Sequence, residues 1–265
     1  MRFVRIGDHV LSHDIYNHGT AKPAIVFVNS LGTDRRIWDE VLAGLGSDYT
    51  LLTFDKRGHG LSDLGTPPYA IEDFSRDLAG LLDHYDIKNA VICGLSVGGL
   101  IALGLYELRP DLVRAVIFAD TAAKIGTPEL WNARIEAVLQ GGTESILDPI
   151  MLRWFTPAYR RDDNADYRGY RNMVARQSSQ GYAGTCAAIR DADFTETARR
   201  LAVPALCLVG DEDGSTPPEV VKAFADLLPH GTFHLIAGAG HIPCVETPDA
   251  FVAHLRQFID HLPGE

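Results

Sequence analysis

The chain has 265 residues, of which 46% are hydrophobic, and its 24 Lys and Arg residues against 35 Asp and Glu residues give a formal net charge of −11. This apolar content excludes a disordered chain, and the length suffices for one domain with a large core and an inserted segment. The acidic surplus and the lack of a basic run exclude the clustered Lys and Arg of nucleic-acid binding, so we expect no nucleic-acid partner.

Residues 1–15 mix charged and apolar side chains and contain no uninterrupted apolar stretch such as a signal peptide needs. We therefore expect a cytoplasmic protein. The cysteines, Cys93, Cys186, Cys207 and Cys244, lack the paired spacing that marks a zinc site. We expect reduced thiols that act as small hydrophobic residues, and no disulfide framework.

Short runs that are nearly continuous in apolar residues recur along the chain and predict strands. They are Ala24–Val28, Leu51–Phe54, Ala90–Cys93, Val113–Phe118, Ala205–Val209 and Phe233–Ile236. Strands buried on both faces by helices have this pattern, whereas a sheet with one wet face alternates apolar and polar residues. The runs therefore predict an α/β fold with a mostly parallel sheet.

Helical patterns separate these runs, at Arg36–Leu45, Ile71–His84, Val97–Leu108, Pro218–Leu228 and Pro248–His261. The uncharged run from Asn89 to Tyr106 is long enough to suggest a membrane helix. It contains Gly94, Gly98, Gly99 and Gly104 and divides into two periods. We interpret it as a buried strand, a turn and a buried helix, and expect no membrane association.

The alternation of strands and helices stops after Phe118 and resumes at Ala205. Between them the sequence offers no strand, and helices are expected at Trp131–Leu139, Ile150–Phe155, Tyr170–Gln177 and Thr185–Arg190. We therefore expect a helical lid at residues 124–190, inserted into a core formed by residues 1–123 and 191–265. A lid above the carboxyl ends of the strands is placed to select the substrate.

A serine lies between two glycines where a predicted strand meets a predicted helix, in Gly94-Leu95-Ser96-Val97-Gly98. On such a tight turn the hydroxyl is exposed at the helix N-terminus, where negative charge is favoured. Ser96 is therefore our candidate nucleophile. The alternative is a glycine-rich packing turn without a catalytic role.

A serine hydroxyl needs a base, and the base needs an acid that fixes its tautomer. His241 is the candidate base because it follows the last strand and precedes the last helix; the alternative is a loop histidine that caps that helix or packs on the sheet. Asp213 is the candidate acid because it lies deep in the loop after the Ala205–Val209 strand, and we expect Asp211 to make only local turn hydrogen bonds. Asp120 is the reserve candidate.

An oxyanion formed during acyl transfer must meet donors that are already in place. The amide of Val97 has the right position in the turn. The loop after the first predicted strand, residues 29–32, should supply a second donor, and we choose the amide of Leu31. The alternative for this loop is a strand-ending turn rich in small residues.

Together these segments resemble the α/β-hydrolase superfamily over essentially the whole chain, and the order Ser96, Asp213, His241 is the order of its triad. The resemblance implies the α/β-hydrolase fold. Residues 55–62 look like the D-x-R-G-x-G-x-S turn, which is structural in that superfamily, so we assign no catalytic role to His59.

More specifically, the chain is similar to 3-oxoadipate enol-lactonases. The matching stretches are residues 29–33, 121–126, 154–156 and 181–193, several of which border or lie in the expected lid. The resemblance implies that Ser96 opens a five-membered enol-lactone that carries an acetate arm, giving 3-oxoadipate in the bacterial breakdown of aromatic acids.

The carboxylate of such a substrate needs a local cation, because the protein as a whole is negative. Arg134 and Lys124 in the expected lid are the candidates. Trp131 and Trp154 are candidate pocket walls, with packing as the alternative role. No glycine-rich phosphate loop, metal-ligand cluster or dinucleotide fingerprint is present, so we expect a small-molecule lactone or ester substrate and no cofactor or metal.

Two departures from the enol-lactonase pattern keep other functions open. Gly240-His241-Ile242-Pro243 has a form common in general esterases and cofactor-free perhydrolases, and Asp120 stands where asparagine is expected. The alternatives are a general carboxylesterase or perhydrolase, or a ligand receptor that retains a slow triad and recruits a partner through its lid. The sequence carries no signal for an oligomeric state.

Overall fold

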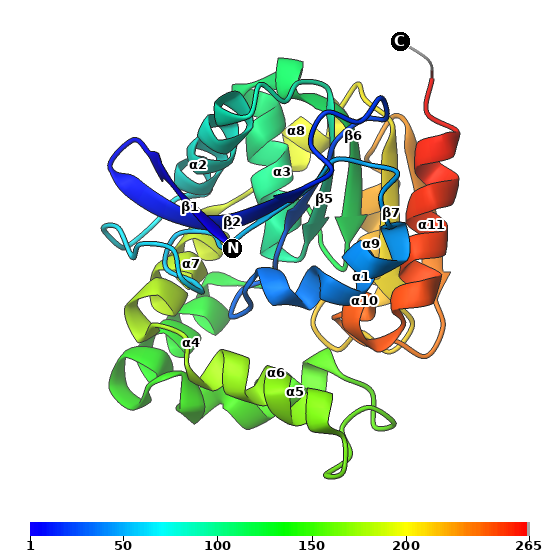
Figure 1. Ribbon diagram of the computed structural model, residues 1–265. Coiled ribbons are helices and arrows are strands. Elements are labelled where there is room, and N and C mark those ends of the chain that lie inside the picture. The colour runs from blue at the N-terminus through cyan, green and yellow to red at the C-terminus, as the bar shows by residue number, and fades with distance from the viewer. Residues whose placement is uncertain (264–265) are drawn as a thin grey trace.

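An eight-stranded sheet forms the centre of the computed structural model, which describes residues 1–263 (Figure 1). Its order is β1-β2-β4-β3-β5-β6-β7-β8. The strands are β1 (Arg2–Ile6), β2 (His9–Tyr16), β3 (Ile25–Val28), β4 (Leu51–Phe54), β5 (Ala90–Leu95), β6 (Val113–Ala119), β7 (Ala205–Gly210) and β8 (Gly231–Ile236). From β4 to β8 in this order all neighbours are parallel, which confirms the predicted fold class.

The hairpin of β1 and β2 is not indicated by the sequence pattern. β2 pairs antiparallel with both β1 and β4, so the hairpin extends the parallel sheet at one side. Three of the five residues of β1 are exposed, and its charged residues Arg2 and Arg5 interrupt any apolar run. A strand at the edge of a sheet needs no continuous apolar sequence, which explains why the pattern fails there.

Helices cover both faces of the sheet. They are α1 (Asp39–Leu45), α2 (Ile71–His84), α3 (Val97–Leu108), α8 (Thr195–Arg199), α9 (Pro218–Ala225), α10 (Pro243–Glu246) and α11 (Pro248–Asp260). α2 packs against α3 and α1 packs against α11, and Figure 1 shows the two pairs on different sides of the sheet. Right-handed crossovers between parallel strands produce this arrangement.

A helical segment joins β6 to β7. It comprises α4 (Pro128–Gly141), α5 (Leu147–Trp154), α6 (Ala165–Ala175) and α7 (Ser179–Asp191), and α4 packs against α7. Figure 1 shows these helices together below the sheet. The predicted helices thus lie in this segment, with bounds that differ by several residues. That it acts as a lid stays a prediction.

The uncharged run that begins at Asn89 forms β5 and α3. Among residues 1–263, no helix has both the length and the apolar character needed to cross a membrane. The four cysteines are free and buried, as expected from their spacing. Burial raises the pKa of the thiols of Cys93 and Cys207, so these groups are protonated and act as apolar side chains.

Candidate active site

Ser96 occupies a strained turn between β5 and α3. Its φ and ψ are 57° and −118°, in a region that few residues other than glycine adopt. The neighbouring glycines make the turn possible: a Cβ at Gly94 would lie 2.3 Å from the carbonyl oxygen of Gly98, and one at Gly98 would lie 2.2 Å from that of Val28. The predicted turn therefore forms, with Ser96 at the N-terminus of α3.

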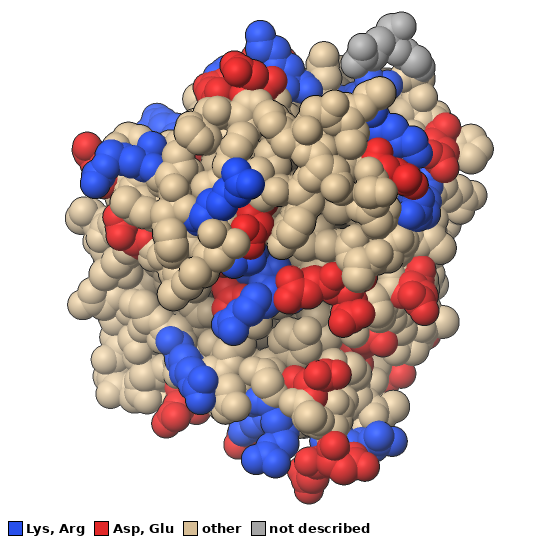
Figure 2. Space-filling view, in the orientation of Figure 1, with Lys and Arg blue, Asp and Glu red and all other residues tan. Residues whose placement is uncertain are grey.

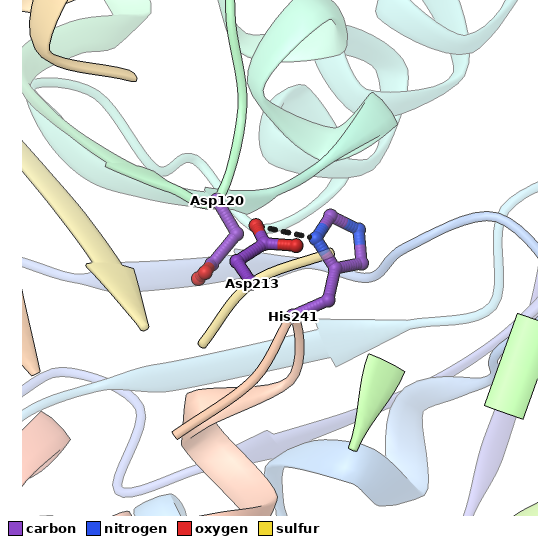
Figure 3. Close-up of side chains that lie close together, drawn as sticks. All are labelled: Asp120, Asp213 and His241. Atoms are coloured by element: carbon purple, nitrogen blue, oxygen red, sulfur yellow. Dashed lines mark hydrogen bonds and ion pairs between the residues drawn. The ribbon is translucent and has the colours of Figure 1, made fainter. Parts of the chain in front are cut away.

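The imidazole of His241 is held by Asp213. Nδ1 of His241 lies 2.9 Å from Oδ2 of Asp213, and both side chains are buried (Figure 3). The other oxygen of Asp213 accepts hydrogen bonds from the amides of Ser215 and Thr216 at 2.7 and 3.2 Å, and Oδ2 also accepts from the Thr216 hydroxyl at 2.7 Å.

These contacts determine the charge of Asp213. Burial acts to raise its pKa, but the neighbouring His241 and the hydrogen bonds outweigh burial, so the pKa lies below its ordinary value. A charged carboxylate on Nδ1 keeps the proton there and leaves Nε2 as the basic atom.

Asp120, the reserve acid, lies behind this pair. It is fully buried, its Oδ1 accepts from the amide of Gly210 at 3.0 Å, and one oxygen lies within 4.8 Å of the ligand atoms of Asp213 and His241. Burial, and then the charge of Asp213, raise the pKa of Asp120 well above its ordinary value. In the structure Asp213, and not Asp120, contacts Nδ1 of His241, and burial beside Asp213 disfavours the charged form of Asp120.

Ser96 and His241 line one pocket between the sheet and the helical segment. Within residues 1–263, Oγ of Ser96 has no hydrogen-bond partner, so the hydroxyl is free to turn toward His241. The ring of Trp154 lies 6.4 Å from the ring of His241, measured between centroids, and covers this side of the pocket.

Leu31 also lines this pocket, and Val97 directly follows Ser96 as the first residue of α3. Neither amide donates to a loop, turn or cap carbonyl within residues 1–263. Two buried side chains hold the loop: Nζ of Lys56 donates to the Ser30 carbonyl at 2.6 Å, and Nε2 of His59 accepts from an amide of the loop at 3.0 Å. His59 therefore supports the candidate oxyanion loop and faces no reacting group.

The candidate substrate contacts fall into two groups. Trp131, Arg134 and Trp154 line the pocket with Ser96, and the Arg134 guanidinium lies 4.9 Å from the centre of the Trp131 ring. Lys124 does not line the pocket; it is exposed and pairs with Asp193 at 3.1 Å. The structure therefore leaves Arg134 as the one predicted cation in the pocket.

Sequence reasoning missed a second arginine, Arg153, which also lines the pocket. Within the described residues neither Arg134 nor Arg153 forms an ion pair, so both charges are available to an anion. The only signal in the sequence is that Arg153 directly precedes Trp154, at the end of α5.

The expectation that Asp211 makes only local turn hydrogen bonds is wrong. Its Oδ1 accepts from the amides of Gly238 and Ala239 at 2.8 and 3.3 Å, so it joins the loop of the acid to the loop of the base. The reason is the parallel pairing of β7 with β8, which places the loops that follow the two strands side by side.

On the face of the molecule that Figure 2 draws, Lys and Arg lie in small separate groups, several of them beside Asp or Glu. With a net charge of −11, the protein repels anions at long range. An anionic substrate would thus depend on the local charges of the pocket.

Comparisons with known proteins agree with this geometry. Residues 25–254 match the model of a family described as "Alpha/beta hydrolase family". The chain is 35% identical to 3-oxoadipate enol-lactonase 2 of Acinetobacter baylyi, over 87% of this chain and 86% of that relative. Its fold is similar to that of the enol-lactonase from Burkholderia xenovorans LB400, with a TM-score of 0.94 and 32% identity over 98% of this chain and all of the other. It is also similar to a thermophilic esterase from Thermogutta terrifontis, with a TM-score of 0.92 and 27% identity over 99% of both chains.

Proposed function

The chain belongs to the alpha/beta hydrolase family, and from this premise we propose that it is a serine hydrolase that opens 3-oxoadipate enol-lactone to 3-oxoadipate. The observation that carries the proposal is one pocket that holds Ser96, His241 and two arginines without ion pairs. The similarity to two enol-lactonases, one by sequence and one by structure, supports this substrate.

In the proposed reaction, Oγ of Ser96 attacks the lactone carbonyl while Nε2 of His241 takes the hydroxyl proton. Asp213, charged and hydrogen-bonded to Nδ1, stabilises the resulting imidazolium. The carbonyl oxygen becomes an oxyanion, and the amides of Leu31 and Val97 donate to it. The strain at Ser96 keeps the nucleophile fixed at the N-terminus of α3, where negative charge is favoured.

Collapse of the tetrahedral intermediate breaks the bond to the ring oxygen, and His241 returns its proton to that oxygen as the ring opens. The leaving enol remains attached to the acyl chain, so reclosure competes with hydrolysis of the acyl-enzyme. Conversion of the enol to the ketone removes this nucleophile. Water, activated by His241, then releases 3-oxoadipate and restores Ser96.

The acetate arm of the lactone gives the arginines a role. Arg134 and Arg153 lie in the same pocket as Ser96, and a guanidinium binds a carboxylate through charge-assisted hydrogen bonds. Trp131 and Trp154, both buried, form apolar walls that limit the water around this contact. We propose that these four residues, and not Lys124, bind the substrate.

The chemical context follows from the substrate. We propose that the protein acts in the bacterial breakdown of aromatic acids, which the similarity to two proteins named 3-oxoadipate enol-lactonase supports. We also propose a cytoplasmic location, which the four free, buried cysteines support.

Product analysis tests this proposal. The purified protein should convert the enol-lactone to 3-oxoadipate, identified by NMR, and Ser96→Ala should form none above the spontaneous rate. Turnover of simple esters without lactone turnover would instead assign a general carboxylesterase, which the similarity to the Thermogutta terrifontis esterase favours as second candidate. If Ser96→Ala retained both activities, Ser96 would be rejected as the nucleophile.

A further inference from the structure

The end of α5 is hydrogen-bonded to the loops that carry both the acid and the base. The amide of His241 donates to the carbonyl of Trp154 at 2.8 Å, and the amide of Gly214 donates to the carbonyl of Arg153 at 3.2 Å. The side chains of Arg153 and Trp154 line the pocket with Ser96. The residues that would contact the substrate are therefore joined through their backbones to the loops of His241, which would transfer the proton, and of Asp213.

The carboxylate of Glu246, at the end of α10, bridges the same two segments. Its Oε1 accepts from the amide and the hydroxyl of Thr156 at 3.0 and 2.8 Å, just beyond α5. Its Oε2 accepts from the amide of Gly240 at 2.6 Å, immediately before His241. Three donors from two segments thus converge on one carboxylate, and charge-assisted bonds of this kind are the stronger class.

The contact between the segments is close enough to require glycine in the base loop. A Cβ at Gly240 would lie 2.4 Å from the Trp154 carbonyl oxygen and 2.9 Å from Oε2 of Glu246. A Cβ at Gly214 would lie 3.1 Å from Cα of Arg153. Neither loop therefore moves independently of the end of α5 without breaking these contacts.

We propose that Glu246 is a positioning residue that holds the Arg153 end of α5 and the His241 loop as one unit. A substrate carboxylate bound by Arg153 is then presented to the base at a fixed distance. The inference rests on the proposed function and adds to it a link between recognition of the carboxylate and proton transfer. Misplacement of groups by about 1 Å is sufficient to slow catalysis markedly.

The chemistry of the bridge suggests two variants. In Glu246→Gln the side chain keeps its size, but its amide nitrogen is a donor and would face Thr156 or Gly240, both of which donate. In Thr156→Val the hydroxyl is lost and one of the three bonds is removed. Glu219→Gln, at an exposed position of α9, is the control because it removes a carboxylate charge that takes no part in this bridge.

Steady-state kinetics with the lactone and with p-nitrophenyl acetate test the proposal. In Glu246→Gln we expect kcat to fall roughly tenfold to a hundredfold for both substrates, since both need the base. KM should rise severalfold for the lactone alone, because only the lactone reaches Arg153. Thr156→Val should show smaller changes of the same kind in kcat and KM. The double variant Glu246→Gln/Thr156→Val should have the same kcat and KM as Glu246→Gln alone. Glu219→Gln should match the wild type.

A structural role without this link would give a different result. Equal KM changes for both substrates, or additive defects in the double variant, would overturn the proposal. Hydrogen exchange of the Gly240 and His241 amides gives a readout that needs no turnover: exchange should accelerate in both variants, and unchanged protection would also overturn it. If the wild type turns over the ester but not the lactone, the proposed substrate fails, and the exchange result still decides whether Glu246 holds the two segments together. If Glu246→Gln does not fold, Thr156→Val carries the same comparisons.

Discussion

The amide of Gly32 donates to Nε2 of His59 at 3.0 Å, so a buried imidazole holds the loop that carries Leu31. Burial, and then the neighbouring Lys56, lower the pKa of His59 well below its ordinary value, which keeps the ring neutral and able to accept this bond. The turn at residues 55–62 thus supports the candidate oxyanion loop, without contributing a reacting group.

Replacement of this imidazole should therefore weaken catalysis and leave substrate binding intact. In His59→Phe the amide of Gly32 loses its acceptor, and the Leu31 donor shifts. We expect kcat to fall roughly tenfold, less than the 10²- to 10³-fold typical when an oxyanion donor itself is removed. Steady-state kinetics with both substrates checks this, and an unchanged kcat in a folded variant would mean that the loop does not depend on His59.

Lys56 should make stability depend on pH in the neutral to alkaline range. Burial lowers its pKa to about 7, whereas the unfolded chain has the ordinary value of 10.5. Above pH 7 the unfolded state binds more protons than the folded state, so the free energy of unfolding rises with pH. The contribution amounts to roughly 1 to 2 kcal/mol between pH 7 and pH 8.5.

Urea unfolding of the wild type and of Lys56→Met at these two pH values measures this contribution. The variant lacks the titrating amine, so its free energy of unfolding should rise less than that of the wild type over the same interval. A difference between the two proteins that does not vary with pH would contradict a lowered pKa for Lys56.

Replacement by asparagine should affect catalysis strongly at Asp213 and little at Asp120, although both aspartates are buried. Asp213→Asn removes the charge on Nδ1 and should lower kcat roughly 10³- to 10⁴-fold. Asp120→Asn should leave kcat nearly unchanged, because burial disfavours the charged form of Asp120 and asparagine also accepts from the Gly210 amide. Equal losses in both variants would show that Asp120 shares the role of the acid.

Asp120→Asn should also change the dependence of stability on pH. The folded-state pKa of Asp120 is raised, so above its ordinary pKa the folded state binds one more proton than the unfolded state. Stability of the wild type therefore falls as pH rises toward the folded-state pKa, and Asp120→Asn removes this fall. Urea unfolding at pH 4.5 and pH 7 measures this effect. The free energy of unfolding of Asp120→Asn, relative to that of the wild type, should be higher at pH 7 than at pH 4.5.

The pocket arginines should discriminate between substrates by charge. Arg134→Ala and Arg153→Ala should each raise KM for the lactone roughly tenfold to a hundredfold, the usual cost of a lost hydrogen bond to a charged group. KM for p-nitrophenyl acetate should change little. Arg199→Ala is the control, because Arg199 is exposed on α8 and pairs with Glu196. Equal effects on lactone and ester would reject a carboxylate site.

Much of the fold follows from sequence pattern because the central strands are buried on both faces. The bounds of β4, α2 and α3 agree with their predicted ranges, since apolar periodicity and turn residues mark both ends. β1 lies at the edge of the sheet and α10 has only four residues, so neither produces a comparable pattern.

The candidate site shows a similar division. Ser96 and His241 are marked by the turns around them, and Asp213 by its depth in a loop. Arg153, Asp211 and Glu246 gain their places through contacts between loops that are distant in sequence, which periodicity does not encode. Lys124 shows the converse: as a cation of the expected lid it was a candidate substrate contact, but it is exposed and pairs with Asp193.

The loss of ultraviolet absorbance of 3-oxoadipate enol-lactone, followed beside hydrolysis of p-nitrophenyl acetate, tests the central claim most directly. The wild type should have a far higher kcat/KM for the lactone than for the ester, and Ser96→Ala should abolish both activities. Ester turnover with little lactone turnover would contradict the proposed substrate. Absence of both activities in the folded wild-type protein would contradict the assignment of an enzyme and favour a ligand receptor.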